Sequence, residues 1–149
     1  MIKYQGGCHC GQVRFKTESD PLMVHLCHCA RCQKLQGTVT IYVVFNEMVE
    51  FSGQLSEYVT TGSSGLPVRY FFCPNCGTNI SSSQDAYKGD GIAIILSAFD
   101  DPHQFEPEWE NFCELKPKWL QDSGCIKKSF DGHNGEEMLT WIMEEYFPN

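Results

Sequence analysis

Cysteine is the residue type in this chain whose number and spacing point most directly to chemistry. The 149 residues include nine cysteines, and most of them fall into three short groups. These groups are Cys8-His9-Cys10, Cys27-His28-Cys29-Ala30-Arg31-Cys32 and Cys73-Pro74-Asn75-Cys76. Thiols this close in sequence bridge each other poorly, whereas such spacings are typical of tetrahedral zinc ligands. The odd number of cysteines also disfavours a disulfide framework, so the pattern predicts metal binding.

The segment Cys73-Pro74-Asn75-Cys76-Gly77 has the form of a zinc knuckle. Its proline restricts the backbone, and its glycine permits a tight turn that brings two sulfurs together. Because a knuckle supplies only two ligands, a second pair is needed. We expect Cys8 and Cys10 to supply it from an extended strand, in which alternate side chains share a face. Four thiolates fill the coordination shell, which is typical of a structural zinc site.

The remaining group, Cys27, Cys29 and Cys32, offers three sulfurs to a second metal ion. Three protein ligands and one open position are typical of a catalytic zinc site. The alternative is a second closed site, completed by Cys113 or Cys125; otherwise we expect these two cysteines to be small packing residues. Iron or another thiophilic metal remains an alternative to zinc. A redox interpretation of the knuckle is disfavoured because no thioredoxin-like βαβ pattern surrounds it.

Several cationic and histidine side chains lie close in sequence to the three-cysteine group. Arg31 and Lys34 flank it and are candidates to bind the carboxylates of an anionic ligand, although solvated surface charge is the alternative. His9 and His28 lie between cysteines, so in a strand their side chains would point away from the metal. His25 is a candidate proton donor, because it would face the same side of its strand as the cluster.

Composition excludes several functional classes. The net charge of −8 argues against a nucleic-acid-binding protein, which normally carries a basic surplus. The longest apolar runs, residues 41–45 and 92–96, are much shorter than the roughly 20 residues of a membrane-spanning helix. The first residues contain no secretory signal pattern, so we expect a cytoplasmic protein with reduced thiols.

The pattern of apolar residues predicts one mainly β domain over residues 1–149. A helical turn is expected over residues 30–36, before Gly37, and a C-terminal helix is expected to begin at a cap on Asn134. The predicted strands cover residues 12–17, 24–29, 38–45, 49–51, 55–60, 68–72 and 91–98.

Four segments resemble the motifs of a known family. The first is Gly6-Gly7-Cys8-His9-Cys10-Gly11-Gln12-Val13-Arg14-Phe15, and the second is Cys27-His28-Cys29-Ala30-Arg31-Cys32-Gln33-Lys34 followed by Gly37. The third is Phe72-Cys73-Pro74-Asn75-Cys76-Gly77-Thr78, and the fourth is Phe99-Asp100-Asp101-Pro102 with Phe105, Pro107 and Trp119 beyond it. In this order they resemble the glutathione-dependent formaldehyde-activating enzyme family, also called the centromere protein V domain family, over residues 5–120.

The resemblance implies a β-tent (Mss4-like) fold of twisted β-sheets that two zinc ions hold together. It implies that Cys8, Cys10, Cys73 and Cys76 hold a structural zinc, and that Cys27, Cys29 and Cys32 hold a catalytic one. The implied activity is a carbon–sulfur lyase reaction, the condensation of formaldehyde with glutathione to S-(hydroxymethyl)glutathione. The expected partners are therefore glutathione or a similar thiol and an aldehyde, and a homodimer is left open.

One departure from the family separates this chain from many relatives. The family often has a histidine in the stretch that corresponds to Glu108-Trp109-Glu110-Asn111-Phe112-Cys113, and this chain has none there. If that histidine contacts substrate in relatives, the preference for glutathione changes here. The alternative to an enzyme is a non-catalytic zinc-binding scaffold or protein-interaction module of the same fold.

Overall fold

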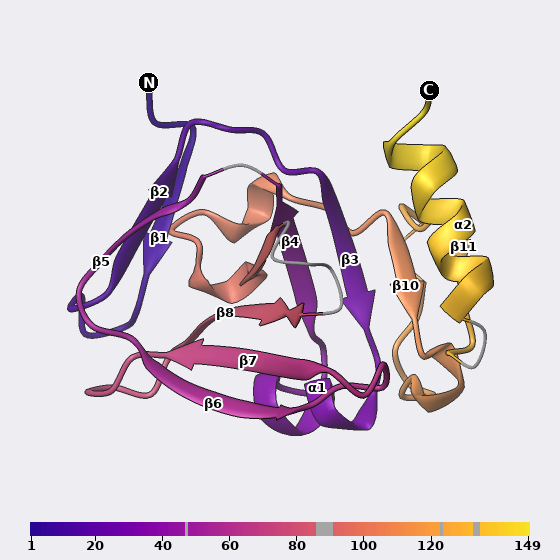
Figure 1. The fold of residues 1–149 in the computed structure, drawn as a ribbon, viewed down its shortest axis with the longest axis horizontal. Helices are drawn as coiled ribbons and strands as arrows, with labels where there is room; N and C mark the ends of the chain where they lie inside the picture. The colour runs from indigo at the N-terminus through magenta and orange to yellow at the C-terminus, as the bar shows by residue number, and fades with distance from the viewer. Residues whose placement is uncertain (47, 86–90, 123, 133–134) are drawn as a thin grey trace. The chain divides into compact units, whose positions relative to one another are not determined.

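The structure is a computed structural model that describes residues 1–46, 48–85, 91–122, 124–132 and 135–149. The chain forms two compact units, one of Met1–Pro21 with Val43–Phe105 and the other of Leu22–Tyr42 with Glu106–Asn149. Strands dominate the described residues, and a helix lies near the C-terminus, so the mainly β prediction is confirmed (Figure 1). The assignment of residues 1–149 to one domain stays a prediction. None of the helices in the described residues is long and apolar enough to cross a membrane.

The first unit is built from antiparallel strands. Strands β1, β2 and β5 form a three-stranded sheet in that order, and β6, β7, β8 and β9 pair successively as an antiparallel meander (Figure 1). The bounds are β1 (Tyr4–Gly7), β2 (Arg14–Thr17), β5 (Glu50–Ser52), β6 (Ser56–Thr61), β7 (Pro67–Phe72), β8 (Asn79–Gln84) and β9 (Ile92–Ile95), followed by the short 3-10 helices η2 (Leu96–Ala98) and η3 (Pro102–Gln104).

Aromatic side chains form the core of the first unit. The Phe15 ring meets the Phe99 ring edge to face at 5.1 Å between centroids, and Phe99 lies 4.7 Å from Phe105. Gly6 permits this packing because a Cβ there would lie 2.1 Å from the Ala98 carbonyl oxygen. The core therefore joins the strand before the first cysteine pair to the segment after β9.

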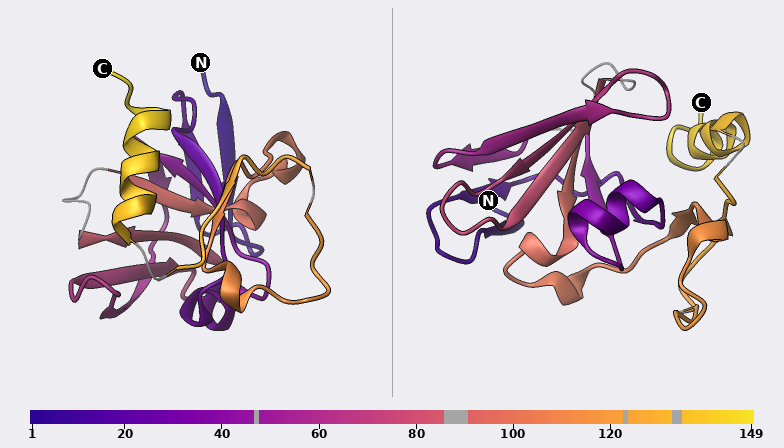
Figure 2. Two further views of the ribbon diagram at one scale, coloured as in Figure 1. Left: turned by 90° about the vertical axis from the view of Figure 1, so that its right-hand side faces the viewer. Right: turned by 90° about the horizontal axis from the view of Figure 1, so that it is seen from below.

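The second unit combines parallel strands with two helices. Its elements are β3 (Met23–Cys27), α1 (Ala30–Gln36), β10 (Trp109–Asn111), η4 (Cys113–Leu115), β11 (Lys128–Ser129) and α2 (Gly135–Tyr146), and the boundary between the units falls within β4 (Ile41–Phe45). Strand β10 pairs in parallel with both β3 and β11. Figure 2 shows in orange the loop that follows β10, and in yellow the helix α2.

Helix α2 packs through Trp141 and Ile142. The Trp141 ring contacts Trp109 and Phe130 at centroid distances of 6.0 and 5.7 Å, and Ile142 is buried. The Tyr146 hydroxyl donates to Oε2 of Glu108 at 3.2 Å. This helix therefore covers the β10 strand with an amphipathic face. The predicted cap, Asn134, lies outside the described residues.

Most predicted strands differ from the structure by only a few residues at their ends, but β1, β8, β10 and β11 were not predicted. Strand β8 has the sequence NISSSQ and was not predicted, because its serines follow no apolar alternation even though Ser81 and Ser82 are buried. Cys8 and Cys10 lie in the turn between β1 and β2, and the expectation that an extended strand carries them is wrong. A hairpin connection brings the two sulfurs together instead.

Candidate metal centres

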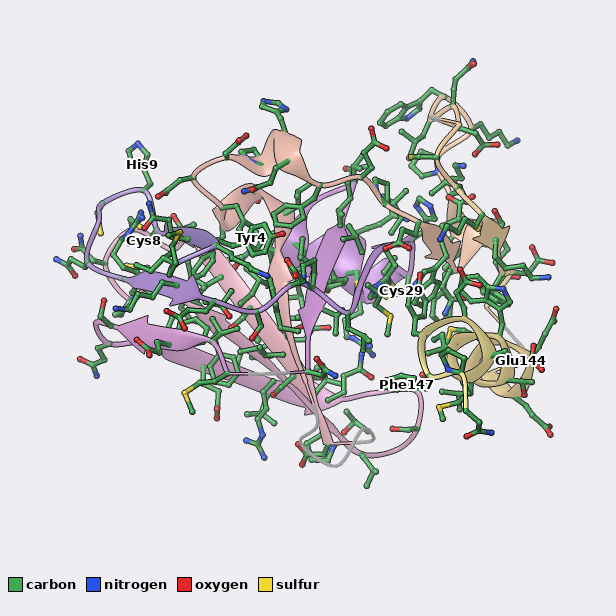
Figure 3. All side chains as sticks on the ribbon, turned by 90° about the horizontal axis from the view of Figure 1, so that it is seen from above. Tyr4, Cys8, His9, Cys29, Glu144 and Phe147 are labelled. Atoms are coloured by element: carbon green, nitrogen blue, oxygen red, sulfur yellow. The ribbon has the colours of Figure 1, made fainter. Side chains whose placement is uncertain are left out.

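The first unit gathers Cys8, Cys10, Cys73 and Cys76 into one cluster. Their sulfur atoms all lie within 4.8 Å of one another, with Cys10 Sγ 3.5 Å from Cys8 Sγ and 3.7 Å from Cys73 Sγ. A tetrahedral zinc with bonds of about 2.3 Å separates its sulfur ligands by roughly 3.8 Å. The arrangement of the four cysteines therefore fits a closed tetrahedral zinc site. Figure 3 labels Cys8 and also His9, whose exposed ring points away from the cluster.

Two tight turns position these four sulfurs. Gly77 has a φ of +76° and donates its amide to the Cys73 carbonyl at 2.9 Å, which closes the knuckle as predicted. On the hairpin side, the Val13 amide donates to the Cys8 sulfur at 3.2 Å. The Thr78 hydroxyl lies 3.2 Å from the Cys76 sulfur and lowers the pKa of Cys76 to about 5, with help from backbone amides. Amide and hydroxyl donors of this kind stabilise thiolate ligands.

The second unit gathers Cys27, Cys29 and Cys32, whose sulfurs also lie within 4.8 Å of one another. Cys27 ends β3, and Cys32 lies inside α1. Cys29, labelled in Figure 3, caps the first turn of α1, where its sulfur accepts the Cys32 amide at 3.2 Å. Strand, cap and helix thus direct three sulfurs to one point. Within the described residues, neither Cys113 nor Cys125 joins this group, and no other candidate ligand completes it.

The three thiols of this cluster do not share charge equally. Hydrogen bonds from the Cys27 and Cys32 thiols lower the pKa of Cys29, and the Arg31 charge acts in the same direction. Donation to Cys29 correspondingly raises the pKa of Cys27. The Tyr42 hydroxyl, which the sequence analysis did not single out, lies 3.1 Å from the Cys32 sulfur. These contacts favour the thiolate form of Cys29.

Arg31 and Lys34 both lie on α1, on either side of Cys32 in sequence. Arg31 is half-buried and close enough to influence Cys29, whereas Lys34 is exposed in the last turn of the helix. Their assignment as ligand-binding residues stays a prediction, but the Arg31 charge does act on the cluster.

The histidines occupy different environments from one another. His25 is half-buried and stacked on Trp109, and desolvation lowers the pKa of its ring to about 4. A ring with a lowered pKa is mostly neutral at neutral pH, and the assignment of His25 as a proton donor stays a prediction. His28 is fully buried and points away from the cysteine sulfurs toward Glu110, with its Nε2 atom 2.9 Å from Oε2 of Glu110.

Glu110 belongs to a third group of side chains that the sequence analysis did not identify. His28, Glu110 and Cys113 offer ligand-type atoms within 4.8 Å of one another. The ammonium group of Lys116 lies 3.2 Å from Oε2 of Glu110 and competes with any cation there. Nothing in the sequence marked this group, because β10 has the sequence WEN and was not predicted as a strand.

Comparison with known proteins gives a family match that covers both cysteine clusters. Residues 3–115 match the model of the family described as glutathione-dependent formaldehyde-activating enzyme. The chain belongs to this family. A protein of Halomonas elongata that carries the provisional name glutathione-dependent formaldehyde-activating enzyme is 25% identical, over an alignment that covers 92% of each chain. The family match includes all seven clustered cysteines and Glu110, whereas α2 lies beyond it.

Proposed function

We propose that this protein is a zinc-dependent carbon–sulfur lyase that adds glutathione or a related thiol to formaldehyde or a similar small aldehyde. The observation that carries the proposal is the three-sulfur cluster of Cys27, Cys29 and Cys32, which no further candidate ligand completes among the described residues. Family membership supports the general activity. In this proposal Cys8, Cys10, Cys73 and Cys76 hold a second, structural zinc ion.

The donor set favours thiol chemistry over hydrolysis. Three thiolates around one divalent zinc leave the centre with a net negative charge, which makes it a weaker acidifier of water than a site of neutral histidines. When bound, the zinc ion would hold a substrate thiol as a thiolate at its open position. In the addition, the thiol sulfur forms a bond to the carbonyl carbon, and the carbonyl oxygen takes up a proton.

The chain's own residues prepare the cluster for this role. The Cys32 amide and the Arg31 charge stabilise negative charge on Cys29, and the Tyr42 hydroxyl contacts the Cys32 sulfur. Arg31 and Lys34 would bind the carboxylates of glutathione. Such local cations are needed because the protein as a whole is acidic. Holding the thiol beside the aldehyde supplies much of the rate, because the reaction then proceeds without a bimolecular encounter.

Zinc analysis and exchange kinetics test the proposal together. We expect two zinc ions per wild-type chain, one in Cys29→Ser and two in Cys125→Ser, the matched control outside both clusters. Two-dimensional exchange NMR then measures the conversion of formaldehyde and glutathione to S-(hydroxymethyl)glutathione and back. We expect the wild type and Cys125→Ser to accelerate exchange, and Cys29→Ser to lose the acceleration.

Two results would contradict the proposal. Two bound zinc ions without any acceleration in the wild type would leave a zinc-binding scaffold as the better interpretation. Unchanged zinc content in Cys29→Ser would show that the three-cysteine cluster is not a metal site. In that case the aldehyde chemistry would have no metal-bound thiolate.

A further inference from the structure

The buried carboxylate of Glu110 lies directly behind the three-cysteine cluster. Strand β10 pairs with β3 so that Glu110 is opposite Leu26 and Asn111 is opposite Cys27. Because successive side chains alternate between the two faces of a sheet, Glu110 points to the face opposite that of Cys27. Its side chain is only 3% exposed, so its charge needs protein partners.

Within the part of the chain that the structure describes, His28, Ser129 and Lys116 hydrogen-bond this carboxylate. His28 Nε2 lies 2.9 Å from Oε2, while the Ser129 hydroxyl donates to Oε1 at 2.8 Å and Lys116 Nζ at 3.3 Å. Burial by itself would raise the pKa of Glu110, but these hydrogen bonds together lower it. The carboxylate is therefore ionised and accepts, and Nε2 of His28 is the donor.

His28, which is hydrogen-bonded to Glu110, lies between Cys27 and Cys29 in the sequence. The His28 amide donates to the Asn111 carbonyl at 3.0 Å, and the His28 carbonyl accepts from Gln33 Nε2 at 2.7 Å. With the ring hydrogen-bonded to Glu110, the residue is held at its amide, its carbonyl and its side chain. These hydrogen bonds therefore fix the residue that lies between Cys27 and Cys29.

We propose that Glu110 is a positioning residue for the three-cysteine site and acts through His28. This inference rests on the proposed function, because it gives the three sulfurs a metal-binding role. Glu110 touches neither the metal nor the substrate in this proposal. Its ionised side chain locks the His28 ring, and the locked ring holds Cys27 and Cys29 at the separation that a zinc ion needs. Residues that orient metal ligands without binding the metal themselves commonly raise the metal affinity of a site.

The decisive variant is Glu110→Gln, which keeps the size of the side chain but removes its charge. The matched control is Glu106→Gln, which removes the same charge from an exposed residue of the same segment. Zinc affinity is measured at both clusters by competition with a chromophoric chelator. The cobalt-substituted proteins then report ligand geometry through their visible spectra.

We expect Glu110→Gln to weaken metal binding at the three-cysteine cluster by about 10-fold or more and to change its cobalt spectrum. The four-cysteine cluster serves as an internal control and should keep its affinity. A double-mutant cycle with His28→Gln tests the route of the effect. If Glu110 acts through His28, the double variant should bind no more weakly than His28→Gln alone.

Unchanged affinity and spectrum at the three-cysteine cluster in Glu110→Gln would overturn the inference. Parallel weakening of both clusters would also overturn it, because it would show general destabilisation. A wild-type chain that binds no metal at Cys27, Cys29 and Cys32 would instead contradict the proposed function. The positioning role would then be tested in metal-free protein by the amide chemical shifts of Cys27 and Cys29. Glu110→Gln should change these shifts, and Glu106→Gln should not.

Discussion

The rings of His25 and Trp109 are stacked with their centroids 4.3 Å apart and their planes 9° from parallel. The parallel pairing of β3 and β10 places the two residues opposite each other, so the stack follows from the strand register. Trp109 is buried and also contacts Trp141 of α2. The stack therefore links the strand that ends at Cys27 to the C-terminal helix.

Removing this central ring should destabilise the second unit. We expect Trp109→Ala to lower the free energy of unfolding by about 3 to 5 kcal/mol, because it removes a buried aromatic side chain and leaves a cavity. Trp119→Ala is the matched control, since Trp119 is 67% exposed, and should change stability by less than about 0.5 kcal/mol. Urea unfolding followed by circular dichroism measures both. Equal effects of the two substitutions would contradict the role of the Trp109 packing.

Gly6 should be intolerant of any side chain. In Gly6→Ala the new Cβ would lie 2.1 Å from the Ala98 carbonyl oxygen and 2.7 Å from Phe99 Cα, so the backbone must shift. Gly11→Ala adds the same methyl group at a φ of +85° with no atom within 4 Å, so only backbone strain of about 1 kcal/mol is expected. We expect a much lower melting temperature for Gly6→Ala than for Gly11→Ala. The reverse order would show that β1 and the segment after β9 do not approach as described.

The Thr78 hydroxyl should control metal retention at the four-cysteine cluster. It contacts the Cys76 sulfur at 3.2 Å and accepts the His9 amide at 3.1 Å, so Thr78→Val removes both interactions at almost constant volume. We expect the pKa of Cys76 to rise from about 5 and chelators to remove this zinc roughly 10-fold faster. Stopped-flow release to a chromophoric chelator measures the rate. Equal release from wild type and Thr78→Val would refute the role of the hydroxyl, and Thr61→Val at an exposed threonine is the surface control.

Cys113 should be a slow nucleophile at neutral pH. Burial, together with the neighbouring Glu110 charge, raises the pKa of Cys113 to about 11. Because the thiolate is the reactive form, its alkylation rate should rise with pH until about pH 11. At pH 8 the thiolate fraction should be about 100-fold below that of a thiol with a pKa of 9, so alkylation should be slower. Mass spectrometry of the zinc-loaded protein after iodoacetamide treatment measures the modification of Cys113.

A variant gives this prediction a second test. Glu110→Gln removes the like charge but leaves Cys113 half-buried, so the pKa should fall and alkylation at pH 8 should become faster. Rapid alkylation of wild-type Cys113 at pH 7 would contradict the assignment. The same thiol would then have to be treated as a reactive group.

Local spacing was enough to predict much of the fold and both cysteine clusters. The knuckle at Cys73 and Cys76 and the short helix α1 are set by neighbouring residues, so they are visible in the sequence. Strand β8 was missed because the burial of its serines depends on strands far away in sequence. The turn that carries Cys8 and Cys10 was mistaken for a strand, because both structures can bring two sulfurs to one side.

The sequence by itself determined the three short cysteine groups, since ligand spacing within each group is a local property of the chain, whereas the tertiary structure brings Cys8 and Cys10 to Cys73 and Cys76. It could not show that His28 is held by Glu110, because the two residues are 82 positions apart and meet only through the parallel pairing of β3 and β10. Only the tertiary structure decided that His25 stacks on Trp109 and that Cys113 lies with Glu110. The physical reason is that burial and long-range strand register set the charge of these groups, and neither is encoded in local spacing.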